Sequence, residues 1–203
     1  MTSSKAHLTF KPVTKATGAD FEALFESPGG PSYCWCMYTR VSKDEAKTAN
    51  TDAKARKPMM MERIDGRIPV GLVAYDQGEP IAWVSVAPRE TFHHLKGPDA
   101  EDGETIWSLS CMYVKRQHRG EGIGHQLIDA AVKYARKRKA DTVEAYAVHP
   151  DSPSYRNMGF ISAYEKAGFE TVGKLGTRRT VMRRKLWSRP SKLTVSARAR
   201  AKG

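Results

Sequence analysis

The chain has 203 residues with a formal net charge of +12, and 40% of its residues are hydrophobic. This length and apolar content exclude a wholly disordered chain and predict one folded domain with a buried core. Eleven basic residues and no acidic ones lie within residues 174–203, so the rest of the chain carries a net charge of only +1. A basic end of this kind is typical of contact with a polyanion, whether nucleic acid, an acidic membrane or a phosphate-rich cofactor, and equally of a solvated tail.

The apolar segments and the cysteines indicate a protein that lies outside the membrane. The uncharged apolar runs 68–75 and 105–114 are shorter than the ~18 apolar residues of a membrane span, and the first residues lack the apolar core of a signal peptide. Three cysteines, two of them at Cys34 and Cys36, do not make a disulfide framework. We therefore expect a soluble cytoplasmic protein.

Helices are expected in the first third of the chain. Phe21, Leu24 and Phe25 have the spacing of one helix face, and the sequence Ser-Pro-Gly-Gly-Pro ends that helix. The polar segment 42–67 predicts one or two further helices, with a capping box that starts at Ser42.

Strands are expected in the middle of the chain. The β-rich runs 69–75 and 81–87 are separated by a glycine-containing loop and predict an antiparallel hairpin. A third strand over 105–114, an amphipathic helix over 123–139 and a strand over 142–148 predict a βαβ unit with parallel pairing.

The last part of the chain predicts a helix over 155–166 and strands over 169–172 and 180–186. The fold class is therefore α/β, a mixed sheet with helices on both faces. We expect a single domain over residues 1–188 and a basic tail without regular order over residues 189–203.

A glycine-rich loop, Arg-Gly-Glu-Gly-Ile-Gly at 119–124, joins the third strand to the amphipathic helix. Glycines allow a tight turn that exposes backbone N–H groups, and the helix start adds the positive end of its dipole. With Arg119 as an added charge, the loop predicts a cradle for a phosphate or pyrophosphate. A merely tight turn between strand and helix is the alternative, since the loop matches neither a Walker A motif nor a full Rossmann fingerprint.

Two segments resemble signatures of the GNAT acetyltransferase superfamily. Residues 114–124, Val-Lys-Arg-Gln-His-Arg-Gly-Glu-Gly-Ile-Gly, resemble its acetyl-CoA-binding motif, and residues 164–169, Tyr-Glu-Lys-Ala-Gly-Phe, resemble its second signature. The resemblance covers roughly residues 68–187, and residues 8–67 would supply the first strand and the helices on the acceptor side. The segment 33–37, Tyr-Cys-Trp-Cys-Met, looks like one near the start of some bacterial members.

The resemblance implies a GNAT-like acyl-CoA N-acyltransferase fold and an acetyl-CoA-dependent N-acetyltransferase. Such an enzyme moves an acetyl group to a primary amine by direct attack in a ternary complex, without a metal. In the family the strand before the loop bulges, so the backbone of residues 111–114 would pair with the pantetheine arm, and the loop amides would hold the pyrophosphate. The implied acetyl-CoA contacts are Met112, Tyr113, Val114, Arg119, Gly120, Glu121, Gly122, Ile123, Gly124, His125 and Asn157.

The resemblance also implies catalytic roles. Tyr164 matches the family tyrosine that protonates the departing CoA thiolate, with a core aromatic as the alternative interpretation. The amine acceptor must lose a proton, and Glu104, just before the bulged strand, is our first candidate for the base. A solvated loop carboxylate is the alternative for Glu104, and Tyr113, Ser110 and His149 are weaker candidates.

Other features remain open from the sequence alone. The Cys-x-Cys segment is interpreted as structural or pocket-lining rather than as a metal site, and Cys111 as a small buried apolar residue. Trp35, Trp83 and Trp107 either line an acceptor pocket or pack in the core.

Two rival functions remain beside acetylation of a small amine. One is acetylation of a macromolecule, a protein amine or an aminoacyl-tRNA, with the basic tail as a docking surface. The other is a non-catalytic module that binds CoA or nucleic acid. The sequence determines neither the acceptor nor the oligomeric state, for which a homodimer is one option.

Overall fold

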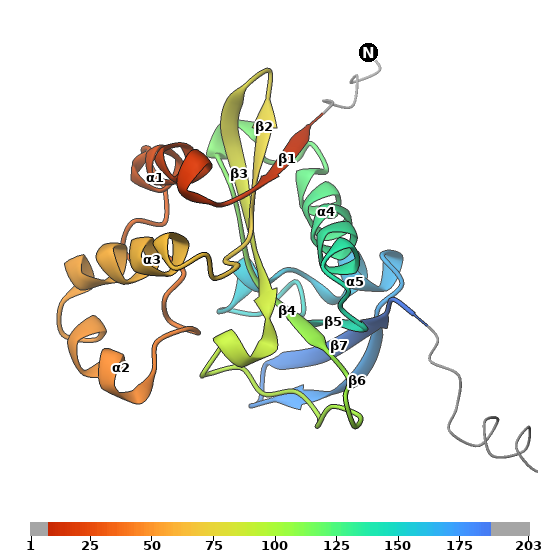
Figure 1. Ribbon diagram of the computed structural model, residues 1–203. Helices are drawn as coiled ribbons and strands as arrows, with labels where there is room; N and C mark the ends of the chain where they lie inside the picture. The colour runs from red at the N-terminus through yellow and green to blue at the C-terminus, as the bar shows by residue number, and fades with distance from the viewer. Residues whose placement is uncertain (1–7, 188–203) are drawn as a thin grey trace, which may run out of the picture.

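The computed structural model describes residues 8–187, and the predicted basic tail over 189–203 lies outside them. The fold is built on one seven-stranded sheet with the order β1-β2-β3-β4-β5-β7-β6 (Figure 1). Only β4 and β5 pair in parallel; the other neighbouring strands of this sheet are antiparallel. The predicted mixed sheet is therefore confirmed. The strands are β1 (Thr9–Pro12), β2 (Leu72–Asp76), β3 (Glu79–Pro88), β4 (Ile106–Val114), β5 (Thr142–Ala147), β6 (Glu170–Leu175) and β7 (Arg179–Lys185).

The predicted βαβ unit consists of β4, α4 (Ile123–Lys137) and β5. The apolar stripe of α4, which includes Leu127 and Ile128, is buried against β3 and β4. Burying that stripe provides much of the free energy that holds the helix on the sheet. The helix ends at Lys137, two residues earlier than predicted, because Lys139 has a φ of +62° and leaves the helical conformation.

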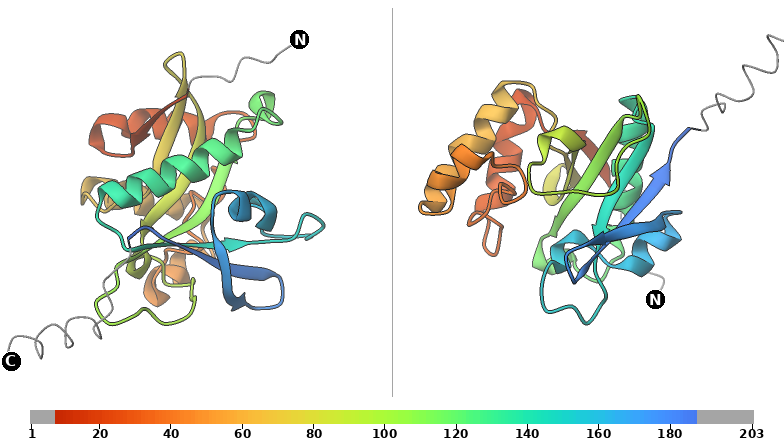
Figure 2. Two further views of the ribbon diagram at one scale, coloured as in Figure 1. Left: turned by 90° about the vertical axis from the view of Figure 1, so that its right-hand side faces the viewer. Right: turned by 90° about the horizontal axis from the view of Figure 1, so that it is seen from below.

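The helices of the first third cover the opposite face of the sheet (Figure 2). They are α1 (Gly18–Glu26), α2 (Lys43–Ala49) and α3 (Arg56–Asp65). Phe21 and Phe25 of α1 pack against the rings of Trp35 and Trp83, with the centroids of Phe21 and Trp83 4.8 Å apart. Figure 2 shows α4 and the short helix α5 (Ile161–Lys166) on the other face. Short 3-10 turns complete the described chain: η1 (Lys15–Thr17), η2 (Ala53–Ala55), η3 (Arg89–Thr91), η4 (Arg116–His118) and η5 (Arg156–Met158).

The capping box predicted at the start of α2 is present. The Ser42 hydroxyl accepts a hydrogen bond from the Glu45 backbone N–H at 3.2 Å, and the Glu45 carboxylate accepts one from the Ser42 N–H at 2.7 Å. These bonds satisfy two N–H groups that the helix itself leaves free.

The single helix predicted over 155–166 is wrong. The chain forms η5 and then α5, separated by Gly159 at a φ of +90° and by Phe160 in an extended conformation. A Cβ at position 159 would lie only 2.7 Å from Cε of Met112. The break therefore lets the backbone pass close to β4, which a continuous helix would not do.

A bulge in β4 opens the sheet. Ser85 of β3 pairs with Cys111 of β4 and the next residue, Val86, pairs with Leu109, so Ser110 is an extra residue. The parallel pairing of β4 with β5 ends at the same point, where Leu109 pairs with Ala145. Beyond it, β5 continues to pair with β7 alone. The two strands therefore diverge at the carboxyl end of β4.

Within residues 8–187, no helix has the length and apolar content needed to cross a membrane.

The close packing around Gly71, which precedes β2, generates a stability prediction. Gly71 has a φ of +150°, and a Cβ there would lie 2.1 Å from the Val84 carbonyl oxygen and 2.6 Å from the Trp83 ring. We expect Gly71→Ala to lower the free energy of unfolding by about 3 kcal/mol in urea titrations. Gly78→Ala is the matched control, because Gly78 has a φ of +90° but no atom near its missing Cβ; it is expected to cost about 1 kcal/mol. Equal losses would contradict the packing argument.

Candidate active site

The diverging end of β4 leaves one edge of that strand open. Met112, Tyr113 and Val114 are half-buried and pair with β3 on one side. Within the described residues, no strand pairs with them on the other side, because the pairing with β5 has already ended. An extended chain with amide and carbonyl groups fits such an edge as a further strand would.

The glycine-rich loop lies directly after this open edge. Gly120 and Gly122 have φ values of +88° and +75°, and Gly122 caps the start of α4. A Cβ at either position, or at Gly124, would meet no atom within 4 Å, so the space beside the loop is free. The side chain of Arg119 donates from Nε to the Val114 carbonyl at 3.0 Å and ties the loop to the end of β4.

The loop also presents free backbone donors. Among residues 8–187, the amides of 120–124 donate to no acceptor, whereas the amide of His125 donates to Gly122 at 3.1 Å and that of Arg119 to Arg116 at 3.3 Å. Free amides at the N-terminus of a fifteen-residue helix attract an anion. The loop therefore fits a phosphate or pyrophosphate on the amides of 120–124, while the amides of Arg119 and His125 are already used.

Tyr164 lies fully buried behind the open edge. Its hydroxyl donates to the Met158 carbonyl at 2.7 Å. Burial, and to a smaller extent Cys111, raises the pKa of Tyr164 far above its ordinary value, so the phenol holds its proton at neutral pH. Asn157 lies in η5 and donates from Nδ2 to the Cys111 sulfur at 3.3 Å. The structure thus brings Asn157 next to the bulged strand.

The structure does not bring Glu104 to this site. Its carboxylate accepts hydrogen bonds from the Thr142 hydroxyl at 2.5 Å and from the Glu101 N–H at 2.9 Å. Glu104 precedes the first residue of β4, whereas the bulge lies in the second half of that strand, and Glu104 borders a different cavity beside Leu95. We therefore do not retain the prediction that Glu104 is the base.

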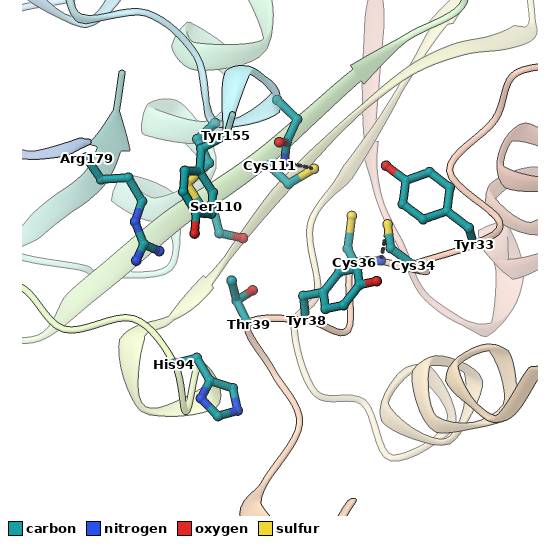
Figure 3. A pocket seen from close by; sticks show the side chains of 12 residues that line it. Tyr33, Cys34, Cys36, Tyr38, Thr39, His94, Ser110, Cys111, Tyr155 and Arg179 are labelled. Carbon is teal, nitrogen blue, oxygen red and sulfur yellow. Dashed lines mark hydrogen bonds between the residues drawn. The ribbon is translucent and has the colours of Figure 1, made fainter. Parts of the chain in front are cut away.

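A cavity of about 510 Å³ opens beside the bulge (Figure 3). Its walls come from the segment 33–39, from His94 after η3, from the bulged part of β4, from residues 155–158 at η5, and from the start of β7. Its lining includes no aspartate or glutamate. The lining residues are Tyr33, Cys34, Cys36, Tyr38, Thr39, His94, Ser110, Cys111, Tyr155, Asn157, Met158 and Arg179.

A buried cation lies beneath the bulge. Arg40 is completely buried and donates to the Val70 carbonyl and to the Ser85 hydroxyl, both at 2.8 Å. The hydroxyls of Ser85 and Ser110 are 2.9 Å apart, so Arg40 is linked through Ser85 to the extra residue of the bulge. Burial lowers the pKa of Arg40 to about 10, and the guanidinium therefore remains charged at neutral pH. Its Nε has no hydrogen-bond partner among the described residues.

Several open questions from the sequence are resolved. Trp35 and Trp83 pack with α1 and do not line the cavity, and Trp107 packs edge-on against Tyr134 of α4. These three tryptophans are core residues. His149 is exposed and contacts Asp151 at 2.7 Å, away from the cavity lining.

The sequence did not identify several residues of the cavity wall. His94 and Arg179 lie far from the glycine-rich loop in the chain, and no short motif marks them. The Cys-x-Cys segment was the only available signal, and its pocket-lining interpretation is confirmed. Within residues 8–187, no group of three or more His, Cys, Asp or Glu is suited to hold a metal ion.

The chain is similar to solved N-acetyltransferase structures over nearly its whole length. One is the PaiA N-acetyltransferase of Thermoplasma acidophilum in complex with coenzyme A, at 15% identity and a TM-score of 0.51, covering 88% of this chain and 98% of that one. Another is the ribosomal-protein-alanine N-acetyltransferase of Brucella melitensis, at 24% identity and a TM-score of 0.50, covering 88% and 99%. A third is NAA60 of Arabidopsis thaliana in complex with acetyl-CoA, at 16% identity and a TM-score of 0.50, covering 88% and 99%.

These structural matches show a shared fold. No curated protein matches the chain in sequence. The model of the acetyltransferase (GNAT) family matches residues 34–169, which is most of the chain and includes both the open edge of β4 and the glycine-rich loop. The chain thus belongs to the acetyltransferase (GNAT) family, and it is an acyltransferase with acetyl-CoA as its cosubstrate.

Proposed function

We propose that the protein transfers an acetyl group from acetyl-CoA directly to a primary amine, with both substrates bound together. The observation that carries this proposal is the open edge of β4, which runs from the free amides of the glycine-rich loop to the cavity at Ser110 and Cys111. A donor held along this edge places its thioester where the cavity begins. Holding two substrates in contact supplies a large part of the rate enhancement.

The residues of this chain that would hold acetyl-CoA lie along one path. The amides of Gly120 to Gly124 would hold the pyrophosphate, with Arg119 fixing the loop against β4. The backbone of Met112, Tyr113 and Val114 would pair with the pantetheine arm. Asn157, beside the Cys111 sulfur, would contact the thioester end of the arm.

Tyr164 would supply the proton to the departing thiolate. Its phenol carries its proton at neutral pH, as an ordinary tyrosine does, and burial raises its pKa further. A thiolate that leaves into a desolvated site is more basic as well, which offsets the weaker acidity of the phenol.

The cavity beside Ser110 would bind the acceptor, and its size is that of a site for a small molecule. We propose His94 as the base that takes the proton from the amine, since a neutral imidazole accepts a proton and the lining includes no carboxylate. This assignment replaces Glu104. The single catalytic domain would span residues 1–188, and a macromolecular acceptor that docks on the tail over 189–203 remains the rival proposal.

The loop assignment predicts the effect of a charge at Gly122. Gly122→Glu places a carboxylate in the free space beside the loop, so we expect saturating acetyl-CoA to raise the melting temperature of the wild type but not of this variant. Gly176→Glu is the matched control, because Gly176 has a similar φ of +66° and equally free space at the turn after β6. The same protection in both variants would contradict the assignment.

The acid assignment predicts a selective loss in Tyr164→Phe. We expect kcat to fall roughly a hundredfold with little change in the KM for acetyl-CoA. Tyr75→Phe is the control: Tyr75 is also a buried tyrosine, and its hydroxyl donates to Asp20 at 2.8 Å away from the cavity. Both variants should lose about 1 kcal/mol of stability, but only Tyr164→Phe should lose turnover. Unchanged kcat in Tyr164→Phe would refute the role.

The base assignment predicts a pH-dependent loss in His94→Gln. We expect kcat/KM to fall roughly a hundredfold at neutral pH. The loss should shrink as the pH approaches about 10, the ordinary pKa of a primary amine, because the amine then loses its proton to water without help from a base. The neighbouring His93→Gln is the control, since His93 does not line the cavity. A loss that is equal at every pH would contradict the role as base.

The acceptor itself is tested by measuring release of the CoA thiol with amino acids, polyamines, aminoglycosides, aromatic amines and peptides. We expect turnover with at least one small primary amine. Turnover with peptides or aminoacyl-tRNA alone, lost when residues 189–203 are removed, would support the macromolecular acceptor instead.

A further inference from the structure

All three cysteines of the chain line one cavity, although Cys111 is far from the other two in sequence. Each of them is free. The acetyl-transfer mechanism proposed above uses none of the three thiols. Their convergence therefore calls for a separate explanation.

The backbone of the Cys-x-Cys segment directs its sulfurs to the same side. Trp35 and Cys36 have φ values of +47° and +51°, a left-handed turn that residues with side chains rarely adopt. Both cysteines line the cavity (Figure 3), and the sulfur of Cys34 accepts a hydrogen bond from the Cys36 N–H at 3.4 Å. A turn that holds two cysteines in this way is suited to a bond between their sulfurs.

The two thiols differ in protonation. Hydrogen bonds from the thiol and N–H of Cys36, together with the charge of Arg56, lower the pKa of Cys34 to about 7 against the opposing effect of burial. The pKa of the Cys36 thiol is raised well above its ordinary value by Cys111, by Cys34 and by burial. At neutral pH Cys34 is therefore in large part a thiolate, while Cys36 keeps its proton.

The surrounding charges support a thiolate at this wall. The guanidinium of Arg56 lies over the Tyr38 ring at 4.7 Å and donates to the Tyr33 carbonyl, and Arg40 is charged and completely buried. No aspartate or glutamate forms an ion pair with Arg40 or Arg56 within residues 8–187. A nearby thiolate supplies the missing negative charge.

We propose that Cys34 and Cys36 form a peroxide-sensitive thiol pair, which a hydroperoxide oxidises to a disulfide at the wall of the acceptor cavity. In the first step the Cys34 thiolate attacks the terminal oxygen of the hydroperoxide. The O–O bond breaks, Cys34 becomes a sulfenic acid, and the released alkoxide or hydroxide takes a proton from water. In the second step the sulfur of Cys36 attacks the sulfur of Cys34, the S–S bond forms, and the S–O bond breaks. The hydroxyl leaves as water with the proton of Cys36.

The disulfide alters the cavity, because both sulfurs belong to its wall and the same segment carries Tyr33 and Tyr38. Oxidation therefore lowers acetyl transfer, and reduction by a dithiol restores it. This effect on turnover rests on the proposed function. Formation of the disulfide does not.

The chain offers a direct readout of the pairing. Trypsin releases residues 16–40 as one peptide with both Cys34 and Cys36, and residues 97–115 as another with Cys111. The full-length protein is treated with hydrogen peroxide at neutral pH, blocked with iodoacetamide and mapped by mass spectrometry without reduction. We expect peptide 16–40 to lose two hydrogens, and peptide 97–115 to be alkylated and unlinked.

Variants separate the roles of the thiols. In Cys36→Ser we expect a sulfenic acid on Cys34 that a dimedone reagent traps, and in Cys34→Ser no oxidation of Cys36 at the same dose. Cys111→Ser is the control and should still form the disulfide. Iodoacetamide alone, on the unmodified chain, should alkylate Cys34 more than tenfold faster than Cys36, which tests the proposal even if a variant fails to fold.

Three results would overturn the proposal: a disulfide that joins peptides 16–40 and 97–115, no oxidation of Cys34 at doses that oxidise free cysteine, or equal alkylation of Cys34 and Cys36. If the disulfide forms but acetyl transfer to a known acceptor is not reduced, the proposed effect on the cavity is refuted, while the proposal that Cys34 and Cys36 form a peroxide-sensitive pair is not. If no acceptor is acetylated at all, the proposed function fails and the peptide map still decides the thiol chemistry.

Discussion

The extra residue in β4 is the constraint on which the rest of the site depends. Because Ser110 has no partner in the ladder with β3, the second half of β4 turns away from β5 after the Leu109–Ala145 pair. A parallel sheet whose strands diverge at their carboxyl ends forms a natural crevice. The short turn η4 leads from the end of β4 to the glycine-rich loop, which Arg119 ties back to Val114 at the start of α4. Donor binding and acceptor access therefore both follow from one unpaired residue.

A series of buried polar side chains supports the bulge. Arg40 binds Ser85, and Ser85 contacts Ser110. A buried guanidinium is stable only when its donors find acceptors, and Val70, from the segment that leads into β2, provides another. The segment that carries Arg40 also carries two cysteines and two tyrosines of the cavity wall, Cys34, Cys36, Tyr33 and Tyr38. The first third of the chain thus both positions the bulge and forms the wall of the acceptor cavity.

Local signals in the sequence predicted the parts that depend on neighbouring residues. The βαβ unit follows from periodicity, and the glycine-rich loop from a short motif whose φ values require glycine. The cavity depends on contacts between distant segments, so His94 and Arg179 carried no signal. Glu104 is close in sequence to the bulged strand but lies before its first residue, at the end away from the bulge, and only the structure shows that separation. The helix break at Gly159 depends on Met112, again a distant contact.

The most direct test of the account is hydrogen exchange of the backbone amides with and without acetyl-CoA. The open edge of β4 and the amides of residues 120–124 have no partners within the described chain, so they should exchange readily when the protein is free. Saturating acetyl-CoA should slow exchange in peptides that cover residues 110–114 and 119–124, while the β1–β2 pair remains unchanged. Unchanged exchange in both peptides at saturation, or protection confined to the cavity beside Glu104, would contradict the central claim.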